Sequence, residues 1–336
     1  MSDTTEHVRL RFRRFAEDEC AGYSAAYFRL SHAVAQDDYL PKFIPLMPDQ
    51  QPNLFFASVQ YLTGATEMPM SRSELHRFVR EHEIEIFQLM SSRRTQTNEV
   101  GRCAILLAAM PAGPLALVEV GASAGLCLML DKYRYDYGSF QIGDSESPVR
   151  LRCRLRGYVR PRIMIPQIVW RCGLDTAPVD LDDPSDVRWL LACVWPDHPA
   201  RRERLAAAIE VGRQQSLSVR HGDLVDDLPK VLDEAPTGAT LVVFHSALFP
   251  YVSPERRQSF ARIITKFSRH RDIVWISNEG ARGSPHISSF APPPAPLQFL
   301  LGRSIAHEGM QTANILGFAH PHGADLEWLA HGDGTM

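Results

Sequence analysis

The chain has 336 residues, a hydrophobic content of 45% and a net charge of −3 at neutral pH. This length allows one large domain or a domain with a cap, and the apolar content is ample for a core. The nearly balanced charge gives no bulk attraction to nucleic acid or to an anionic membrane. We therefore expect a small-molecule substrate as the partner, no nucleic acid and no membrane.

The first residues and the cysteines indicate the compartment. Residues 1–14 are polar and charged, unlike a signal peptide, and the longest apolar tract, residues 103–118, is interrupted by prolines. The six cysteines form no Cys-x-x-Cys pair. We expect free, mostly buried thiols in a reducing environment and a cytoplasmic protein.

Residues 1–113 are expected to form a helical cap region. Apolar side chains recur at helical spacing over residues 7–36 and 53–63. A further helix is expected after Ser71, because Ser71 and Glu74 have the spacing of a capping box, in which each side chain bonds to the other residue's backbone N–H.

The polar run of residues 93–99 allows two interpretations. It is either a loop whose Asn98 caps a helix over residues 99–110, or a loop that reaches over a cofactor or substrate. In the second case the substrate-binding side chains are Arg94, Gln96 and Asn98.

One stretch, residues 115–130, organises the rest of the chain. Five of its first six residues are apolar, glycines follow at Gly121 and Gly125, and an apolar stretch continues to Leu130. This pattern predicts a strand, a tight turn and a helix. The first amides of a helix have no partner within it, so we expect them to face outward, where an anionic group can bind.

The spacing within this turn separates three kinds of chemistry. A dinucleotide fold requires Gly-x-Gly-x-x-Gly, and here Ser123 occupies the position of the second glycine. A serine hydrolase requires Gly-x-Ser-x-Gly, which the residues from Gly121 to Gly125 match. The adenosylmethionine junction of class I methyltransferases has an acid, a glycine and a second glycine four residues on. Glu119, Gly121 and Gly125 meet that pattern.

The upstream segment favours the methyltransferase-like interpretation. A nucleophile elbow lies well inside its sheet, after several strands and an oxyanion-hole loop. Residues 1–114 instead look helical and have no His-Gly-Gly motif. In a methyltransferase core the same junction follows the first strand, so helices can precede it. A serine hydrolase that uses Ser123 stays the alternative.

Residues 148–157 alternate between apolar residues and arginines, which predicts one strand with a face in water. The arginine face is either a solvated edge or a surface that holds an acidic substrate. Because no core strand is due here, we expect an insertion around residues 139–166. The arginines are Arg150, Arg152, Arg154 and Arg156.

Acidic residues follow two later strands of the expected sheet. Asp175 ends one strand, with Asp180 as its rival, and either carboxylate can accept hydrogen bonds from both hydroxyls of a ribose. Asp223 and Leu224 follow a short strand over residues 217–221, and a carboxylate there suits the adenine amino group, which is a donor. These positions predict the nucleoside side of a cofactor site.

Polar side chains also follow the next two strands, residues 240–245 and 272–277. In an open parallel sheet the ligand crevice lies beyond these carboxyl ends. We therefore expect substrate contact or proton transfer from His245, Tyr251 and Glu279, with His245 as the candidate general base.

Three other features complete the chain. Trp195 is a candidate substrate-side residue, because an indole face attracts the sulfonium cation. His320 and His322 have the form of a metal fragment, but no carboxylate or cysteine stands at a fitting spacing, so no metal site is expected. The proline-rich residues 284–296 are expected to form a loop near the site.

Several motifs together resemble a bacterial family catalogued as domain of unknown function 2332. The chain has Cys127 where that family usually has asparagine. The motifs are Arg94-Thr95-Gln96-Thr97-Asn98-Glu99, Glu119-Val120-Gly121-Ala122-Ser123-Ala124-Gly125-Leu126, Trp189-Leu190, Trp195-Pro196-Asp197, Gly222-Asp223, His245-Ser246 and His320-Pro321-His322-Gly323. Separately, Glu119 to Gly125, Asp175 and Gly222-Asp223 resemble the cofactor motifs of class I adenosylmethionine methyltransferases.

We therefore expect an α/β fold with a doubly wound, Rossmann-like sheet of the class I methyltransferase type over residues 114–336. The resemblance implies S-adenosylmethionine (SAM) as cofactor, with Gly121, Ala122, Ser123 and Gly125 at its methionyl end. It also implies methyl transfer to a small-molecule acceptor, in which the protein mainly positions the nucleophile. The alternatives are a serine hydrolase and a non-catalytic nucleoside-binding module.

Overall fold

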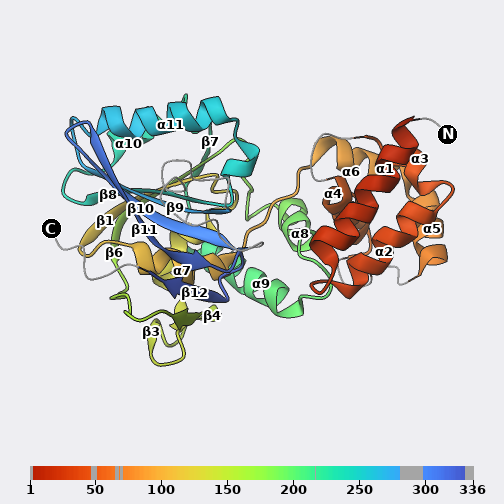
Figure 1. The fold of residues 1–336 in the computed structure, drawn as a ribbon, viewed down its shortest axis with the longest axis horizontal. Coiled ribbons are helices and arrows are strands. Elements are labelled where there is room, and N and C mark those ends of the chain that lie inside the picture. The colour runs from red at the N-terminus through yellow and green to blue at the C-terminus, as the bar shows by residue number, and fades with distance from the viewer. Residues whose placement is uncertain are drawn as a thin grey trace. The chain divides into compact units, whose positions relative to one another are not determined.

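The computed structural model describes residues 3–46, 51–64, 68, 71–215, 217–280 and 298–329. The chain divides into two compact units (Figure 1). The helical unit contains Met1–Thr97 and Asp182–Ala206, and the sheet unit contains Asn98–Leu181 and Ala207–Met336. The expected loop of residues 284–296 lies outside the described residues.

The helical unit confirms the N-terminal helices. The capping box is present, since Ser71 Oγ accepts from Glu74 N at 3.2 Å and Glu74 Oε2 accepts from Ser71 N at 3.1 Å. A π-helical turn, Phe15–Cys20, follows the first helix. The α-helices are α1 (Asp3–Arg14), α2 (Ala25–Gln36), α3 (Leu40–Phe43), α4 (Gln51–Leu62), α5 (Arg72–Glu81), α6 (Glu83–Ser92) and α8 (Pro184–Ala192).

A core of aromatic rings holds the helical unit together. Phe12 packs edge-on against Phe55 and Phe56, with ring centroids 5.8 and 5.7 Å apart. Trp189, from α8, joins the same core at 2% exposure, and its Nε1 donates to Arg94 O at 2.8 Å. A segment that follows the first strands of the sheet in sequence is therefore part of the helical core.

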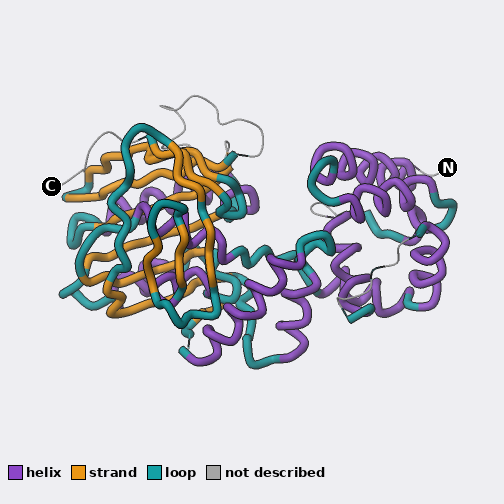
Figure 2. The backbone as a smooth tube through the Cα atoms, turned by 90° about the horizontal axis from the view of Figure 1, so that it is seen from below, coloured by secondary structure: helices purple, strands orange, loops and turns teal. Residues whose placement is uncertain are grey.

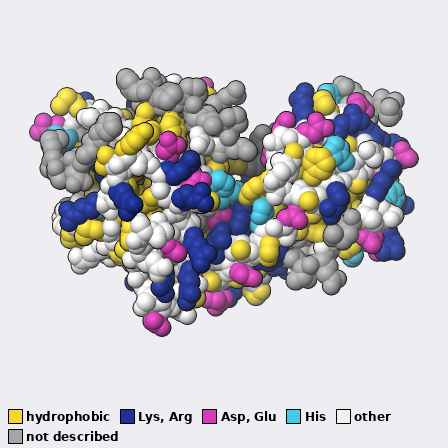
Figure 3. Space-filling view, turned by 60° about the horizontal axis from the view of Figure 1, so that its bottom comes forward, with side chains coloured by type: hydrophobic (Ala, Val, Ile, Leu, Met, Phe, Trp, Pro, Cys, Tyr) yellow, Lys and Arg dark blue, Asp and Glu magenta, His cyan; other side chains and the backbone are white. Residues whose placement is uncertain are grey.

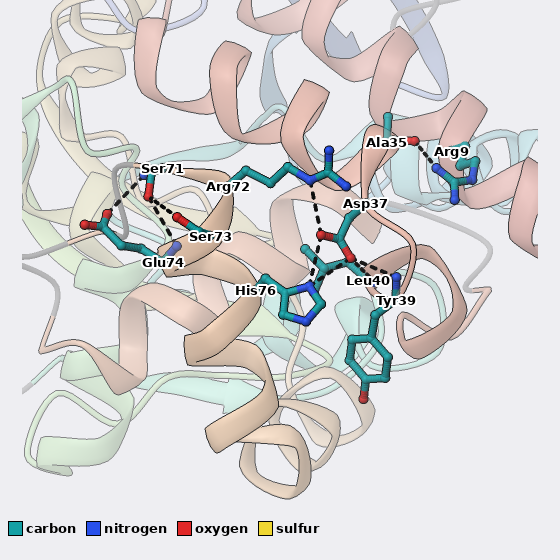
Figure 4. A network of polar contacts seen from close by, with 10 residues as sticks. All are labelled: Arg9, Ala35, Asp37, Tyr39, Leu40, Ser71, Arg72, Ser73, Glu74 and His76. Atoms are coloured by element: carbon teal, nitrogen blue, oxygen red, sulfur yellow. Dashed lines mark hydrogen bonds and ion pairs between the residues drawn. The ribbon is translucent and has the colours of Figure 1, made fainter.

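A buried carboxylate connects three helices of this unit (Figure 4). Asp37 follows α2, and its Oδ1 accepts from the backbone N–H of Tyr39 at 2.8 Å and of Leu40 at 3.0 Å, where α3 begins. Its Oδ2 contacts Arg72 Nε at 3.3 Å and His76 Nδ1 at 3.0 Å, both on α5. Asp37 thus satisfies backbone donors and joins α5 to the α2–α3 connection.

Removal of this carboxylate should destabilise the helical unit in a pH-dependent way. Burial acts to raise the pKa of Asp37, but the hydrogen bonds from Leu40, Tyr39 and His76 lower it from 3.8 to about 2. A carboxylate with a depressed folded pKa stabilises the fold above its unfolded pKa, and this contribution of about 2 kcal/mol is lost as the pH falls from 3.8 toward 2.

We expect the free energy of unfolding of Asp37→Ala to be about 2 kcal/mol lower than that of wild type at neutral pH. We also expect this free energy to fall less steeply than that of wild type as the pH is lowered. Urea unfolding at a series of acidic pH values measures both effects. Asp38→Ala is the matched control, because Asp38 is the exposed neighbour. Parallel acid profiles for wild type and Asp37→Ala would contradict the prediction.

The sheet unit contains a mixed, mostly parallel nine-stranded sheet in the order β5-β12-β11-β10-β9-β8-β1-β6-β7 and a small sheet in the order β3-β2-β4. Strands are orange in Figure 2. Their bounds are β1 (Pro114–Val120), β2 (Arg134–Asp136), β3 (Gln141–Gly143), β4 (Arg150–Arg152), β5 (Arg154–Arg156), β6 (Gln167–Asp175), β7 (Val219–His221), β8 (Thr240–Ser246), β9 (Ile273–Gly280), β10 (Phe299–His307), β11 (Met310–Ala319) and β12 (Asp325–Trp328).

Helices cover both faces of the large sheet (Figure 1). α10 (Leu228–Glu234) and α11 (Pro254–Phe267) pack on one face, where strand residues such as Val118, Val243 and Trp275 complete a buried apolar cluster. α7 (Cys103–Ala109), which is buried along its whole length, packs on the other. A further helix, α9, spans Pro199–Gln214.

The strand order reverses in the middle of the sheet. From β7 to β9 all neighbours are parallel, and along the chain these five strands come third, second, first, fourth and fifth. β10, β11 and β12 then continue the sheet in antiparallel pairs. The reversal lies between β1 and β8, and a ligand crevice in such sheets lies beyond the carboxyl ends of the strands at the reversal.

The single strand expected over residues 148–157 is wrong, because the chain changes partners at Cys153. Cys153 N donates to Asp136 O at 2.9 Å in the small sheet, and Arg154 N donates to Ala324 O at 2.9 Å beside the large one. Two short strands, β4 and β5, result. All four arginines of this segment are exposed, as expected for a solvated face, and Figure 3 shows Lys and Arg side chains gathered on the surface of the sheet unit.

No helix among the described residues is both long and apolar enough to cross a membrane.

Candidate functional site

The loop that follows β1, residues 121–125, requires its two glycines. Gly121 and Gly125 have φ angles of 72° and 69°, in the left-handed region that favours glycine. A Cβ on Gly121 would lie 2.6 Å from the Leu248 side chain. Ser123 also has a positive φ, 52°, which is uncommon for a residue with a side chain. The glycine spacing therefore follows from the backbone geometry of this glycine loop.

The amides of the glycine loop are bonded within the protein. Gly121 N and Ala122 N both donate to Leu174 O, at 2.8 and 3.3 Å, and Ser123 N donates to Asp175 Oδ2 at 2.7 Å. These three loop amides are therefore not free to receive an anionic group, and a role for the first amides of the following helix stays a prediction. A ligand beyond β1 would meet the side chains around the loop before it meets the loop's N–H groups.

The segment after the loop is a 3-10 helix, η3 (Leu126–Lys132), rather than the expected α-helix. Side chains outside η3 occupy its carbonyl groups: Tyr133 Oη donates to Leu126 O at 2.8 Å, and Arg171 Nη1 donates to Leu128 O at 2.8 Å. An α-helix would use these carbonyls for its own backbone bonds. The expected α-helix is therefore replaced here by a short 3-10 helix.

Asn98 holds the glycine loop instead of capping a helix. Its Nδ2 donates to Ser123 Oγ at 2.9 Å, and its Oδ1 accepts from Ala124 N at 3.2 Å. The cap of the next helical segment is Glu99, whose Oε1 accepts from Gly101 N at 2.9 Å. The polar run before β1 thus contributes Asn98 to the site, where its side chain supports the glycine loop.

Asp175 lies at the end of β6, beside β1, as expected. Both of its carboxylate oxygens accept backbone bonds, Oδ2 from Ser123 N and Oδ1 from Ala177 N at 2.8 Å. Each oxygen has a second lone pair, so the carboxylate keeps acceptor capacity. The rival, Asp180, is exposed.

Asp223 lies just beyond the end of β7 and forms an ion pair with Arg256. Its Oδ1 also accepts from Val225 N at 2.6 Å. Burial acts to raise the pKa of Asp223, but the bonds from Val225 and Arg256 lower it below its ordinary value. Leu224 is buried in the apolar cluster under α10 and α11, so it packs rather than faces a ligand.

His245 and Glu279 form a fully buried pair at the ends of β8 and β9. His245 Nδ1 lies 2.7 Å from Glu279 Oε1, and both side chains are 0% exposed. Glu279 also accepts from Leu248 N at 2.9 Å and from Phe249 N at 3.3 Å. Tyr251, in the 3-10 turn η4 (Phe249–Tyr251), is instead 63% exposed. The structure therefore pairs two of the predicted catalytic residues and separates the third.

A buried polar cluster lies on the α7 face at the ends of β1, β8 and β9. Arg102 Nη1 donates to Ser246 O at 3.4 Å, and Asn278 Nδ2 donates to Ser246 Oγ at 2.9 Å. Glu119 Oε2 and Asn278 Oδ1 are buried without a hydrogen-bond partner among the described residues. Sequence reasoning named Glu119 but missed the other three, which no spacing pattern distinguishes.

The electrostatic surroundings of Glu119 are unusual for a carboxylate. Burial raises its pKa well above the ordinary value, and the nearby Cys127 and Asp175 raise it further, while Arg102 acts in the opposite direction. A carboxyl group in these surroundings favours its protonated form until a cationic or donor group approaches.

The histidine motif near the C-terminus packs against the segment that precedes α7. Arg102 Nε donates to Pro321 O at 2.9 Å, and His322 Nδ1 lies 3.5 Å from Glu99 Oε2. His322 N donates to His320 Nδ1 at 3.1 Å, which makes the turn compact. The motif therefore supports the buried polar cluster.

Three predicted substrate residues lie in the helical unit: Arg94, Gln96 and Trp195. Trp195 packs there against Phe15 and Tyr23, with ring centroids 5.5 and 5.4 Å apart. Its indole is part of the aromatic core of that unit, and a role in substrate binding stays a prediction.

Comparison with known proteins agrees with the motif resemblance. No curated protein matches the chain. A family model described as "Uncharacterized protein conserved in bacteria (DUF2332)" matches residues 9–328, nearly the whole chain. The chain therefore belongs to the DUF2332 family.

Proposed function

We propose that the chain binds SAM beyond the carboxyl ends of β1, β6 and β7 and transfers its methyl group to a small-molecule acceptor. One observation carries the proposal: three neighbouring parallel strands present an acid each at or near their carboxyl ends, next to the strand-order reversal. These acids are Glu119, Asp175 and Asp223.

The acids match the donor groups of SAM. The ribose has two hydroxyl donors and adenine has an amino donor, so Asp175, or its rival Asp180, and Asp223 would supply the acceptors. Glu119 would meet the methionyl end, whose ammonium and sulfonium groups favour a carboxylate. In this proposal the doubly wound part of the sheet is of the class I methyltransferase type.

Calorimetric titration with SAM and S-adenosylhomocysteine tests the cofactor. We expect Kd values on the order of micromolar for wild type and at least a tenfold loss, about 1.4 kcal/mol, for Asp223→Ala. Arg256→Ala is the matched control, because it breaks the same ion pair but leaves the carboxylate. No binding by wild type at millimolar ligand would contradict the proposal. Binding without methyl transfer to any acceptor in a panel would instead support a non-catalytic module.

A serine hydrolase is the second candidate, favoured by the left-handed φ of Ser123 within Gly-x-Ser-x-Gly. In that case a fluorophosphonate probe should label Ser123, and Ser123→Ala should abolish the label. Two observations count against it: Ser123 Oγ accepts a bond from Asn98, and His245 is fully buried among aromatic rings. An unlabelled wild-type protein would exclude this candidate.

A further inference from the structure

We propose that Cys127 and Cys103 form a thiol pair that reacts with hydroperoxides and closes to a disulfide. Cys127 lies in η3 and is partly exposed, whereas Cys103, the first residue of α7, is fully buried. The Cys103 thiol donates to the backbone carbonyl of Cys127, with its Sγ 4.0 Å from Cys127 O, so the buried sulfur lies against the partly exposed cysteine. This inference does not depend on SAM binding.

The two thiols differ in the way that such chemistry requires. The hydrogen bond from Cys103 lowers the pKa of Cys127; burial opposes this, and the nearby Arg102 lowers the pKa further. Burial raises the pKa of Cys103 well above its ordinary value. Because Cys127 is partly exposed and Cys103 is buried, a hydroperoxide meets Cys127 first, and Cys103 has the position of a resolving neighbour.

The reaction balances with a hydroperoxide as the only co-reactant. The Cys127 thiolate attacks the O–O bond, takes one oxygen as a sulfenic acid, and a proton completes the departing water or alcohol. The Cys103 sulfur then attacks the sulfenic sulfur, the S–S bond forms, and a second water leaves. Two thiols are oxidised by two electrons, and the peroxide is reduced.

The position of the pair gives the reaction a consequence. The disulfide would join α7 to η3, the helical segments before and after β1, and would remove the Cys127 thiol, one of the groups that raise the pKa of Glu119. The other cysteines do not share these features. Cys153, for example, is buried, and burial raises its pKa to about 12.

The full-length reduced protein should be treated with a small excess of hydrogen peroxide and mapped by mass spectrometry. We expect a product two hydrogens lighter, with a peptide link between Cys103 and Cys127. The link should persist in Cys153→Ser, the matched control, and be absent in Cys127→Ser. In Cys103→Ser, dimedone should trap a sulfenic acid on Cys127.

Alkylation of the untreated protein gives a second readout that needs no variant. Iodoacetamide should modify Cys127 at least about tenfold faster than Cys153. The proposal is overturned if peroxide leaves the native Cys103 and Cys127 unlinked, or if other cysteine pairs form at the same rate.

Discussion

Glu279→Ala should unfold with a free energy about 3–5 kcal/mol lower than wild type, because it leaves three donors, two of them fully buried, without their acceptor. These donors are His245 Nδ1, at 2.7 Å, and the backbone N–H groups of Leu248 and Phe249, at 2.9 and 3.3 Å. Glu279 is fully buried, so water cannot replace the carboxylate without opening the core. The loss should also release the turn that places Leu248 against Gly121.

Two further variants distinguish the loss of the hydrogen-bond acceptor from the loss of side-chain volume. Glu279→Gln keeps one acceptor oxygen and nearly the same volume, so we expect a loss at least about 1 kcal/mol smaller than for alanine. His245→Phe keeps a ring against Phe249, whose centroid lies 4.0 Å away, and removes one donor. Equilibrium urea unfolding compares the three variants. Equal losses for alanine and glutamine at position 279 would show that hydrogen bonding is not the cause.

Gly323→Ala should be the second severe substitution, at about 4 kcal/mol or more. Gly323 has a φ of +80°, and a Cβ there would lie 2.0 Å from Gly101 O, a backbone atom that cannot rotate away. In the reverse direction, a Cβ on Gly101 would lie 2.4 Å from His322 O. The two glycines therefore allow the histidine motif to approach the segment before α7.

Gly138→Ala isolates the backbone contribution. Gly138 has a φ of +84°, but a Cβ there meets no heavy atom within 4 Å. We expect it to cost only the left-handed strain, about 1–2 kcal/mol. Thermal and urea unfolding of both variants measure the difference. If Gly138→Ala and Gly323→Ala were equally destabilised, the close approach of the backbones would not be the reason for the glycine.

Local sequence signals predicted most of the regular structure. The capping box at Ser71 and the apolar strand β8 depend on neighbouring residues, so their patterns are visible in one stretch of sequence. The tight turn after β1 was also predicted, because glycines mark positions where the backbone can be left-handed.

The predictions that the structure corrects all involve residues that contact the segment from elsewhere in the chain, which a local sequence pattern does not reveal. Residues 126–132 have the composition of an α-helix, but Tyr133 and Arg171 occupy their carbonyl groups. Apolar residues and arginines do alternate over residues 148–157, but β4 pairs with β2 and β5 pairs with β12, so the segment forms two strands. Asn98 was a candidate for the site, but its bonds to the glycine loop could not be predicted, and Arg102 stands in no pattern that marks it.

The composition of the helical unit has a consequence for how the protein is made. Its aromatic core includes Trp189, and the unit contains two separate stretches of chain, Met1–Thr97 and Asp182–Ala206. The N-terminal helices are synthesised before the second stretch, but their core cannot be completed until that stretch has also been made. The first strands of the sheet have been synthesised by then. An N-terminal fragment that stops before α8 should therefore be a poor folding unit, and nascent chains of this protein would be exposed to proteases and chaperones until translation has passed the end of the second stretch.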